Sequence, residues 1–136
     1  MHMMRIALAL LLIAGPTTWA QAPAPQRLVP NDAKPGIPTA TIDLGNEFPQ
    51  MKGFILRQTL ATVEPGTGRA WHSHAQSPEI ARILSGTLTE ARNGGPPTAY
   101  GPGSTLVNDG KTEHMWANMG SEPVVMLLTS VHEAKK

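Results

Sequence analysis

Short strand-like segments, separated by turns rich in glycine and proline, constrain the fold of this chain more than any other feature. β-Branched and aliphatic residues fill these segments, and turn pairs such as Pro65-Gly66 and Ser85-Gly86 separate them. The predicted strands are residues 53–64, 69–74, 80–84, 87–92, 104–107, 113–118 and 123–132. No long stretch follows the period of a helix. The pattern predicts an all-β sandwich or barrel.

The length and composition fit one small β domain. A chain of 136 residues is long enough for one domain with a single core. Aromatic residues make up only 4%, whereas glycine and proline number 13 each, which favours many turns over long helices. The absence of cysteine excludes disulfides, thiolate metal ligands and cysteine nucleophiles.

The first 20 residues are typical of a signal peptide. Arg5 supplies a positive charge, residues 6–14 form an apolar run, and residues 18–20 offer a small-x-small cleavage site. The apolar run is shorter than the roughly 20 residues that a membrane-spanning helix needs, and an uncleaved anchor is the alternative. We therefore expect residues 1–20 to be removed and the mature protein to be secreted or periplasmic, with no stable membrane span.

Prolines dominate the segment that follows. Five of residues 21–40 are proline, which favours extended over helical backbone. We interpret residues 21–45 as a linker, or as an arm that lies against a neighbouring subunit, and residues 46–136 as the folded domain.

The net charge excludes two classes of partner. Loss of Arg5 with the signal peptide reduces Lys plus Arg from 11 to 10, against 10 Asp plus Glu, so the mature chain is near neutral. No basic patch or run indicates binding to nucleic acid or to a membrane surface. A small-molecule substrate or ligand is the partner that the sequence favours.

Three histidines and one glutamate form a pattern that suits a metal ion. His72 and His74 are two residues apart in a predicted strand, so both imidazoles face the same side. Glu79 follows across a short turn, at the start of the next strand, and His114 lies in a later strand. Imidazole nitrogens and a carboxylate oxygen suit borderline divalent ions such as Fe, Mn, Zn, Ni or Cu.

The spacing of these residues resembles the two sequence motifs of the cupin superfamily. The first motif reads Gly66-x5-His72-x-His74-x4-Glu79-x6-Gly86, and every fixed position is present. The second motif is carried by Gly103, His114 and Asn118, whereas Asp109 and Lys111 stand where the family usually has proline and glycine. The resemblance covers residues 53–132 and is that of a small, single-domain cupin.

This resemblance implies a double-stranded β-helix, also called a jelly-roll barrel. In cupins the residues equivalent to His72, His74, Glu79 and His114 bind one divalent metal ion. One or two coordination positions then stay open to water or substrate. The glycines of the motifs are expected in turns. Small cupins are often dimers, so the resemblance also implies a homodimer.

Two further residues share strand parity with His114 and are predicted to line the pocket. They are Trp116 and Asn118. The alternatives are that Trp116 packs the barrel and that Asn118 holds a loop through hydrogen bonds. Three arginines are candidates for contact with an anionic substrate, namely Arg57, Arg69 and Arg82. Arg82 alternates with Ala81 and Ile83 and is expected to face solvent.

The site predicts a function in outline. The leading hypothesis is a metalloenzyme with dioxygenase-like chemistry that acts on a small oxygen-rich organic molecule. Glu79 would then act both as a ligand and as a catalytic general base. The sequence shows no second carboxylate dedicated to proton transfer. A non-catalytic module that binds a metal or a small ligand is the alternative, and a structural barrel with a vestigial site is a third interpretation.

Overall fold

The computed structural model describes residues 32–134. The strands in this part of the chain are β1 (Ile37–Asp43), β2 (Phe54–Val63), β3 (Gly68–Ser73), β4 (Glu79–Ser85), β5 (Leu88–Arg92), β6 (Thr98–Tyr100), β7 (Thr105–Asn108), β8 (Glu113–Ala117) and β9 (Val124–Glu133). The helices are α1 (Leu44–Glu47) and the 3-10 turn η1 (Pro49–Met51). The predicted signal peptide and the first part of the predicted linker lie outside the described residues. Within residues 32–134, no helix has the length and apolar character needed to cross a membrane.

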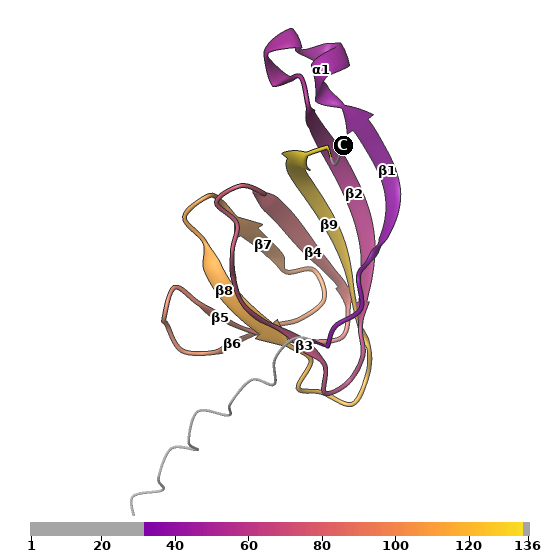
Figure 1. Ribbon diagram of the computed structural model, residues 1–136. Helices are drawn as coiled ribbons and strands as arrows, with labels where there is room; N and C mark the ends of the chain where they lie inside the picture. The colour runs from indigo at the N-terminus through magenta and orange to yellow at the C-terminus, as the bar shows by residue number, and fades with distance from the viewer. Residues whose placement is uncertain (1–31, 135–136) are drawn as a thin grey trace, which may run out of the picture.

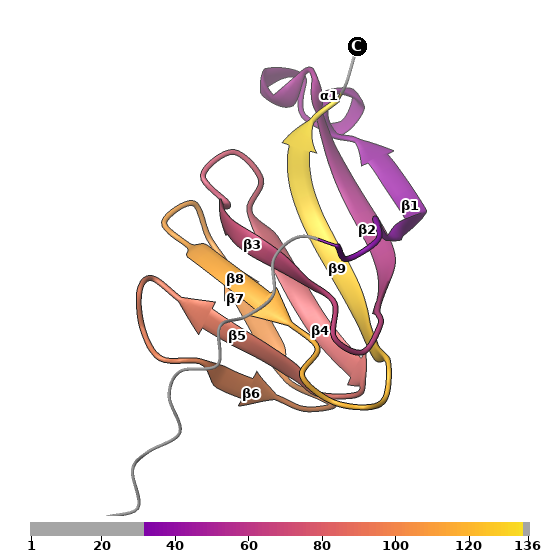
Figure 2. The same cartoon turned by 60° about the horizontal axis from the view of Figure 1, so that its bottom comes forward.

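Two antiparallel sheets face each other and form the walls of a barrel (Figure 1). The larger sheet has the strand order β1-β2-β9-β4-β7, and the smaller sheet has the order β3-β8-β5-β6. Strands that are distant in sequence pair within each sheet, as β2 does with β9 and β3 with β8. Figure 2 shows the ends of β1, β2 and β9 reaching beyond the smaller sheet, where α1 follows β1. The prediction of an all-β fold is confirmed.

Alternating side chains fill the space between the sheets. In β4, Ala81 and Ile83 are buried while their neighbours on either side are exposed, as the two-residue period of a strand requires. The buried cluster consists of Ala61, Val63, Ala81, Ile83, Leu88, Leu106, Val124 and Met126. Burial of each large aliphatic side chain contributes about 1.5–3 kcal/mol. This core fixes β2, β4, β7 and β9 relative to one another, and β4 begins at Glu79 in the candidate site.

The motif glycines lie in turns that need them. Gly86 has φ of +74°, and a Cβ atom at this position would lie 2.5 Å from the carbonyl oxygen of Pro123. Any other residue would therefore clash with the backbone of the chain that enters β9. Gly66 and Gly103 also have positive φ, at +77° and +86°. The expectation that these glycines are turn residues is confirmed.

All seven predicted strands are present, and each predicted end lies within one residue of the observed end. The structure adds β6, a strand of three residues that pairs with β5. This strand follows directly after the turn cluster at residues 93–97, so it is too short and too close to the turn to give a sequence signal of its own.

Part of the predicted linker or arm is a strand of the domain. Residues 37–43 form β1, which pairs with β2 at the edge of the larger sheet, and α1 follows directly. Pro38 has no amide hydrogen to donate, but an edge strand has one side without a partner and tolerates proline. The domain therefore begins before residue 46, and residues 37–45 belong to it.

Candidate metal centre

Three histidine side chains meet inside the barrel. His72 belongs to β3, His74 follows directly after this strand, and His114 belongs to β8. His72 and His114 are direct register partners across the two strands. The amide of His74 donates a hydrogen bond of 3.0 Å to the carbonyl oxygen of Thr112, which continues the alignment beyond the end of β3. Strand alternation then directs all three imidazoles to the interior.

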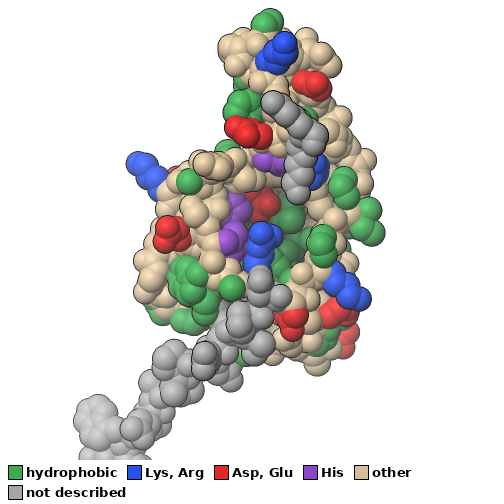
Figure 3. All heavy atoms as spheres, in the orientation of Figure 1, with side chains coloured by type: hydrophobic (Ala, Val, Ile, Leu, Met, Phe, Trp, Pro, Cys, Tyr) green, Lys and Arg blue, Asp and Glu red, His purple; other side chains and the backbone are tan. Residues whose placement is uncertain are grey.

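The Nε2 atoms of the three rings converge on one point. Nε2 of His114 lies 2.9 Å from Nε2 of His74 and 2.9 Å from Nε2 of His72. The ligand atoms of the three residues all lie within 4.8 Å of one another, which makes this group able to hold a metal ion. In Figure 3 the histidine atoms line a hollow in the face of the molecule.

Backbone carbonyls hold two of the rings. Nδ1 of His72 donates a hydrogen bond of 2.8 Å to the carbonyl oxygen of Ala70. Nδ1 of His74 donates a hydrogen bond of 2.8 Å to the carbonyl oxygen of Ser77. Because a carbonyl oxygen can only accept, both Nδ1 atoms carry the hydrogen, and both Nε2 atoms present a lone pair when the rings are neutral.

A buried carboxylate holds the third ring. Nδ1 of His114 donates a hydrogen bond to Oε1 of Glu90, and both residues are almost fully excluded from solvent. A carboxylate hydrogen bond of this kind fixes the orientation of a metal-binding histidine and makes its second nitrogen a better donor to a metal. Nε2 of His114 is therefore also presented as a lone pair.

Three lone pairs that face one another suit a cation. Nitrogen atoms 2.9 Å apart repel each other when neither carries a hydrogen. A divalent ion coordinated by the three nitrogens removes this repulsion and uses all three lone pairs. The donor set of His72, His74 and His114 thus fits a borderline divalent ion.

The environment keeps His72 in the form that binds metals. The pKa of His72 is lowered from 6.5 to about 4, mainly by burial and to a smaller degree by the nearby charges of His114 and Arg69, whereas the hydrogen bond to Ala70 opposes the change. The His72 ring is therefore neutral at neutral pH. A neutral imidazole does not have to lose a proton before it binds a metal ion.

Glu90 is an ionised carboxylate behind the histidines. Its side chain also forms an ion pair of 3.1 Å with Nη2 of Arg92. Burial opposes ionisation of Glu90, but the hydrogen bonds from His114 and Arg92 outweigh it and hold the pKa of Glu90 below its ordinary 4.5. Glu90 thus serves the site by orienting His114 from behind, and the interpretation that no second carboxylate is dedicated to proton transfer stays a prediction.

A chain of hydrogen bonds continues from Glu90 to Glu79. Nη2 of Arg92 donates to Oδ1 of Asn108 at 2.8 Å, and Nδ2 of Asn108 donates to Oε1 of Glu79 at 3.3 Å. Glu79 lines the same cavity as the histidines, although it lies outside the group of three whose ligand atoms converge. Its role as a fourth ligand and as a general base remains a prediction.

Sequence reasoning missed Glu90, Arg92 and Asn108. Glu90 and Arg92 share strand parity with the buried Leu88, so opposite charges stand on the inward side of a predicted strand. This pattern is a usable signal, because charged residues are almost never fully buried unless they are paired. Asn108 resembles an ordinary turn residue in the sequence, since Asp109 and glycine follow it, and nothing marks it there as part of the site.

The turn before His114 forms without the proline and glycine that the family usually has. Oδ1 of Asp109 accepts hydrogen bonds of 3.0 Å from the amide of Lys111 and from the hydroxyl of Thr112. The amide of Thr112 also donates to the carbonyl oxygen of Asp109 at 3.0 Å. An aspartate that bonds to the backbone two residues on builds a turn by itself. The departure from the motif therefore leaves His114 in position.

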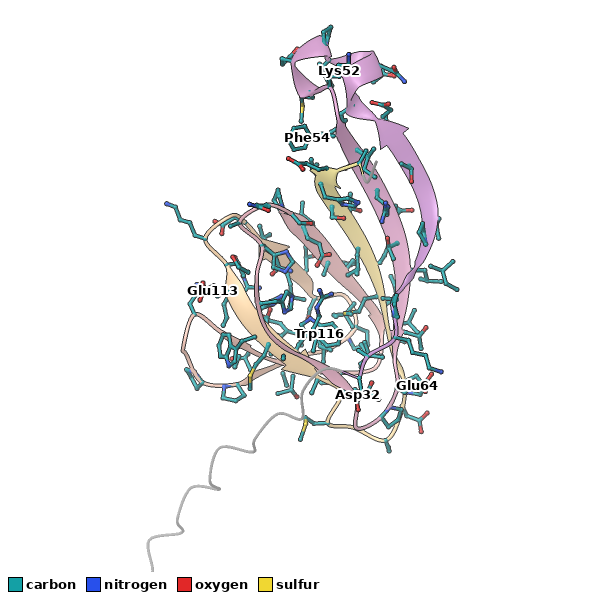
Figure 4. The ribbon with its side chains drawn as sticks, in the orientation of Figure 1. Asp32, Lys52, Phe54, Glu64, Glu113 and Trp116 are labelled. Carbon is teal, nitrogen blue, oxygen red and sulfur yellow. The ribbon has the colours of Figure 1, made fainter. Side chains whose placement is uncertain are left out.

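A cavity of about 140 Å³ opens beside the histidines. Its wall combines polar residues, among them the histidines, Glu79 and Arg69, with an apolar part. The apolar residues are Ala81, Leu88, Leu106, Trp116, Met126 and Leu128. Figure 4 shows Trp116 extending from β8 into the space between the two sheets. A small organic ligand would meet the histidines at one end and an apolar wall at the other.

Asn118 does not line this cavity, in contrast to the prediction. It is fully buried, and its Nδ2 donates to the carbonyl oxygens of Val63 at 2.9 Å and Glu122 at 2.7 Å. Its Oδ1 accepts a hydrogen bond of 2.9 Å from the amide of Gly120. The side chain joins the end of β2 to the turn between β8 and β9, which is the loop-holding alternative. Asn118 lies beyond the end of β8, so strand parity no longer governs its direction.

The fold and the site together define a class of protein. It is an all-β barrel of two facing sheets, with a histidine cluster in its interior that can hold a metal ion. Residues 59–130, more than half of the chain, match the family described as cupin domain. The chain belongs to this family.

Solved structures agree on the fold. TT1209 from Thermus thermophilus is 16% identical with a TM-score of 0.59, and the match covers 81% of this chain and 92% of that one. An uncharacterized conserved protein with a double-stranded beta-helix domain from Klebsiella pneumoniae is 16% identical with a TM-score of 0.56. The match covers 80% of this chain and 91% of that one. A putative sugar phosphate isomerase from Acidithiobacillus ferrooxidans is 22% identical with a TM-score of 0.53. The match covers 68% of this chain and 58% of that one.

Other matches are partial. For three further solved chains the match covers 53%, 61% and 65% of their length. No curated protein matches this chain. At these levels of sequence identity the likeness supports a cupin barrel and leaves activity and substrate to the site itself.

Proposed function

We propose that this cupin binds one divalent metal ion through His72, His74 and His114, with Glu79 as a fourth ligand from the cavity wall. One observation carries the proposal: Nε2 of His114 lies 2.9 Å from Nε2 of both other histidines, while the Nδ1 atom of each of the three rings is committed to an oxygen acceptor. A purely structural histidine cluster would have no reason to turn three lone pairs toward one another. The position of Glu79 in the same cavity supports its inclusion.

The proposed activity is dioxygenase-like chemistry on a small oxygen-rich organic molecule. A bound metal ion would supply a Lewis acid with open coordination positions facing the cavity. Glu79 would accept a proton from a ligand in the cavity, and its hydrogen bond of 3.3 Å from Asn108, which holds the carboxylate, supports this role. The apolar wall around Leu106 and Leu128 favours an organic ligand over water.

We also propose that residues 1–20 direct export and that cleavage after Ala20 releases a mature chain beginning at Gln21. The charged Arg5, the apolar run and the small residues at the cleavage site support this proposal. N-terminal sequencing of the exported protein tests it. An exported chain that still carries residues 1–20 would contradict it.

The metal proposal is tested by elemental analysis of protein purified without chelator. We expect about one divalent ion per chain, because a three-histidine donor set binds tightly at neutral pH. His74→Ala should reduce metal affinity by more than the roughly 10–100-fold that loss of an outer partner causes. His132→Ala is the matched control, since His132 lies outside the converging group. A wild-type protein that stays metal-free after reconstitution at neutral pH contradicts the proposal.

The correct metal then allows the activity to be tested with a panel of small organic substrates. Consumption of dioxygen together with substrate supports the proposed chemistry. Retention of the substrate without change supports the alternative of a metal-dependent binding module. Either outcome tests the proposed reaction alone. The proposal of a metal site rests on the geometry of the histidines and is tested separately.

A further inference from the structure

A β-bulge turns Arg69 toward the histidines. The register between β3 and β8 pairs Arg69 with Trp116 and His72 with His114, so three steps along β3 correspond to two steps along β8. The extra residue changes which side chains face inward, and it brings Arg69 to the same side as His72 despite their odd spacing. Bulges are common next to functional sites because they redirect one side chain in this way.

Arg69 stands at the junction of two cavities. It lines the cavity of about 140 Å³ that contains the histidines and a neighbouring cavity of about 280 Å³. Trp116, Met126 and Leu128 line both cavities as well. The junction therefore combines one guanidinium with an aromatic and aliphatic wall.

Residues 33–36 cover the second cavity. They line it together with Ala61 and Val63 from β2. The segment is tied to β3, because the amide of Gly68 donates a hydrogen bond of 3.0 Å to Oδ1 of Asp32 and the amide of Ala33 donates one of 3.0 Å to the carbonyl oxygen of Gly68. In Figure 4, Asp32 lies beside the start of β3. The covered space is mostly apolar and suits a small hydrocarbon group.

Arg69 is exposed and has no ion-pair partner among the described residues. The ion pairs found among residues 32–134 join Glu90 to Arg92 and to His114, and no hydrogen bond engages the guanidinium of Arg69. Lys34 adds a second cation to the neighbouring cavity. Glu79 is the only carboxylate among the described residues that line the two cavities. Figure 3 shows Lys or Arg side-chain atoms beside the histidine side chains in the hollow.

We propose that Arg69 is the anion-binding residue of this site, and that the natural ligand is an organic carboxylate with a small apolar body. The carboxylate would pair with the guanidinium, which matches its planar, two-oxygen geometry. The apolar body would lie against Trp116 and Leu128. This inference rests on the proposed function, because it assigns the carboxylate to the cavity of the metal centre.

Benzoate and benzamide are the probes that test the proposal. They have nearly the same size and shape, but only benzoate carries a charge. Calorimetric titration of zinc-loaded protein should show benzoate binding and much weaker benzamide binding. Arg69→Met should weaken benzoate binding by about tenfold or more, because a charge-assisted pair is lost. Arg69→Lys keeps the charge but lacks the planar guanidinium. Its benzoate affinity should therefore lie between those of the wild type and Arg69→Met.

Arg82→Met is the matched control. Arg82 lies on β4, is exposed, and donates a hydrogen bond of 2.9 Å to the hydroxyl of Thr105 on the neighbouring strand. Its removal lowers the net charge by the same amount as Arg69→Met and should leave benzoate affinity unchanged. Thermal melting of each variant shows whether the barrel is folded.

The outcomes separate this inference from the metal proposal. No benzoate binding by the wild-type protein at millimolar concentration overturns the inference, as does equal affinity in folded Arg69→Met protein. Equal weakening by Arg82→Met also overturns it, since the effect would then reflect net charge alone. If the protein takes up no metal but binds benzoate through Arg69, the metal proposal fails and the carboxylate site stands.

Discussion

Glu90 accepts a hydrogen bond from Nδ1 of His114 in the interior of the barrel, where the two residues are 1% and 2% exposed. The pair joins two strands of the smaller sheet, because Glu90 lies on β5 and His114 on the adjacent β8. One edge of the His114 ring is thereby fixed by a charged group. The opposite edge presents Nε2 to the other two histidines.

Replacement of Glu90 should weaken metal binding without touching a ligand. We expect Glu90→Gln to lower metal affinity by about 10–100-fold, because a neutral amide holds His114 less firmly and makes its Nε2 a poorer donor. Competition with a chelator at neutral pH measures the change. Glu113→Gln is the matched control, since Glu113 precedes His114 on β8 but is exposed. Unchanged affinity in Glu90→Gln would show that Glu90 plays no part in metal binding.

Glu79 should matter more for turnover than for metal retention. Three histidines already supply a donor set, so Glu79→Gln should still contain about one metal ion per chain at saturating metal. The variant should lose most of the activity of the wild type, because an amide cannot accept a proton from the ligand. Metal content and turnover measured on the same preparation separate the two roles. Glu122→Gln, in an exposed turn, is the control, and full activity in Glu79→Gln would exclude Glu79 as the base.

The metal-free protein should lose stability as the pH falls from 6.5 to about 4. Burial lowers the pKa of His72 from 6.5 to about 4 in the folded protein. Above 6.5 the ring is neutral in both states, and between the two values the unfolded chain takes up a proton that the folded protein does not. The free energy of unfolding therefore decreases as the pH falls across this window. Below about pH 4 the titration of His72 changes it no further.

Denaturant unfolding across this pH window measures the effect. His72→Gln should show a shallower decrease than the wild type, because it lacks the titrating ring. Glu90 contributes at lower pH, since its pKa lies below 4.5 in the folded protein and its stabilising effect is lost as the pH falls through that lowered value. Equal slopes in the wild type and His72→Gln would contradict the assignment to His72.

The strands could be predicted from the sequence because turns at glycine and proline mark both of their ends. Residues 124–133, for example, form one long strand between the turn at Pro123 and the end of the described chain. Strand β1 escaped prediction because prolines before it made the whole segment resemble a linker. These residues form a strand because they pair with β2, and that contact is not local in sequence.

The candidate site was predictable only where local spacing carries the information. His72 and His74 are two residues apart, so strand alternation alone directs them to one side. The partnership of His114 with Glu90 spans 24 residues and depends on the pairing of β5 with β8. The position of Arg69 on the same side as His72 depends on a register shift between β3 and β8, which leaves no trace in either strand's own pattern.

Asn118 should contribute to stability rather than to ligand binding. Its buried amide makes three hydrogen bonds that tie the end of β2 to the turn between β8 and β9. Asn118→Ala leaves two carbonyl oxygens and one amide hydrogen without these partners. An unsatisfied buried group costs about 1–3 kcal/mol, and partial compensation by water makes an overall loss of about 3 kcal/mol the expected result.

Denaturant unfolding of the metal-free protein measures this loss. Asn46→Ala is the matched control, because Asn46 is exposed in α1 and should change the free energy of unfolding by less than about 0.5 kcal/mol. The folded fraction of Asn118→Ala should bind metal and benzoate as the wild type does, since the side chain lies outside the cavity wall. Normal stability with impaired ligand binding would contradict this role. It would support the prediction from strand parity with His114 that Asn118 lines the pocket.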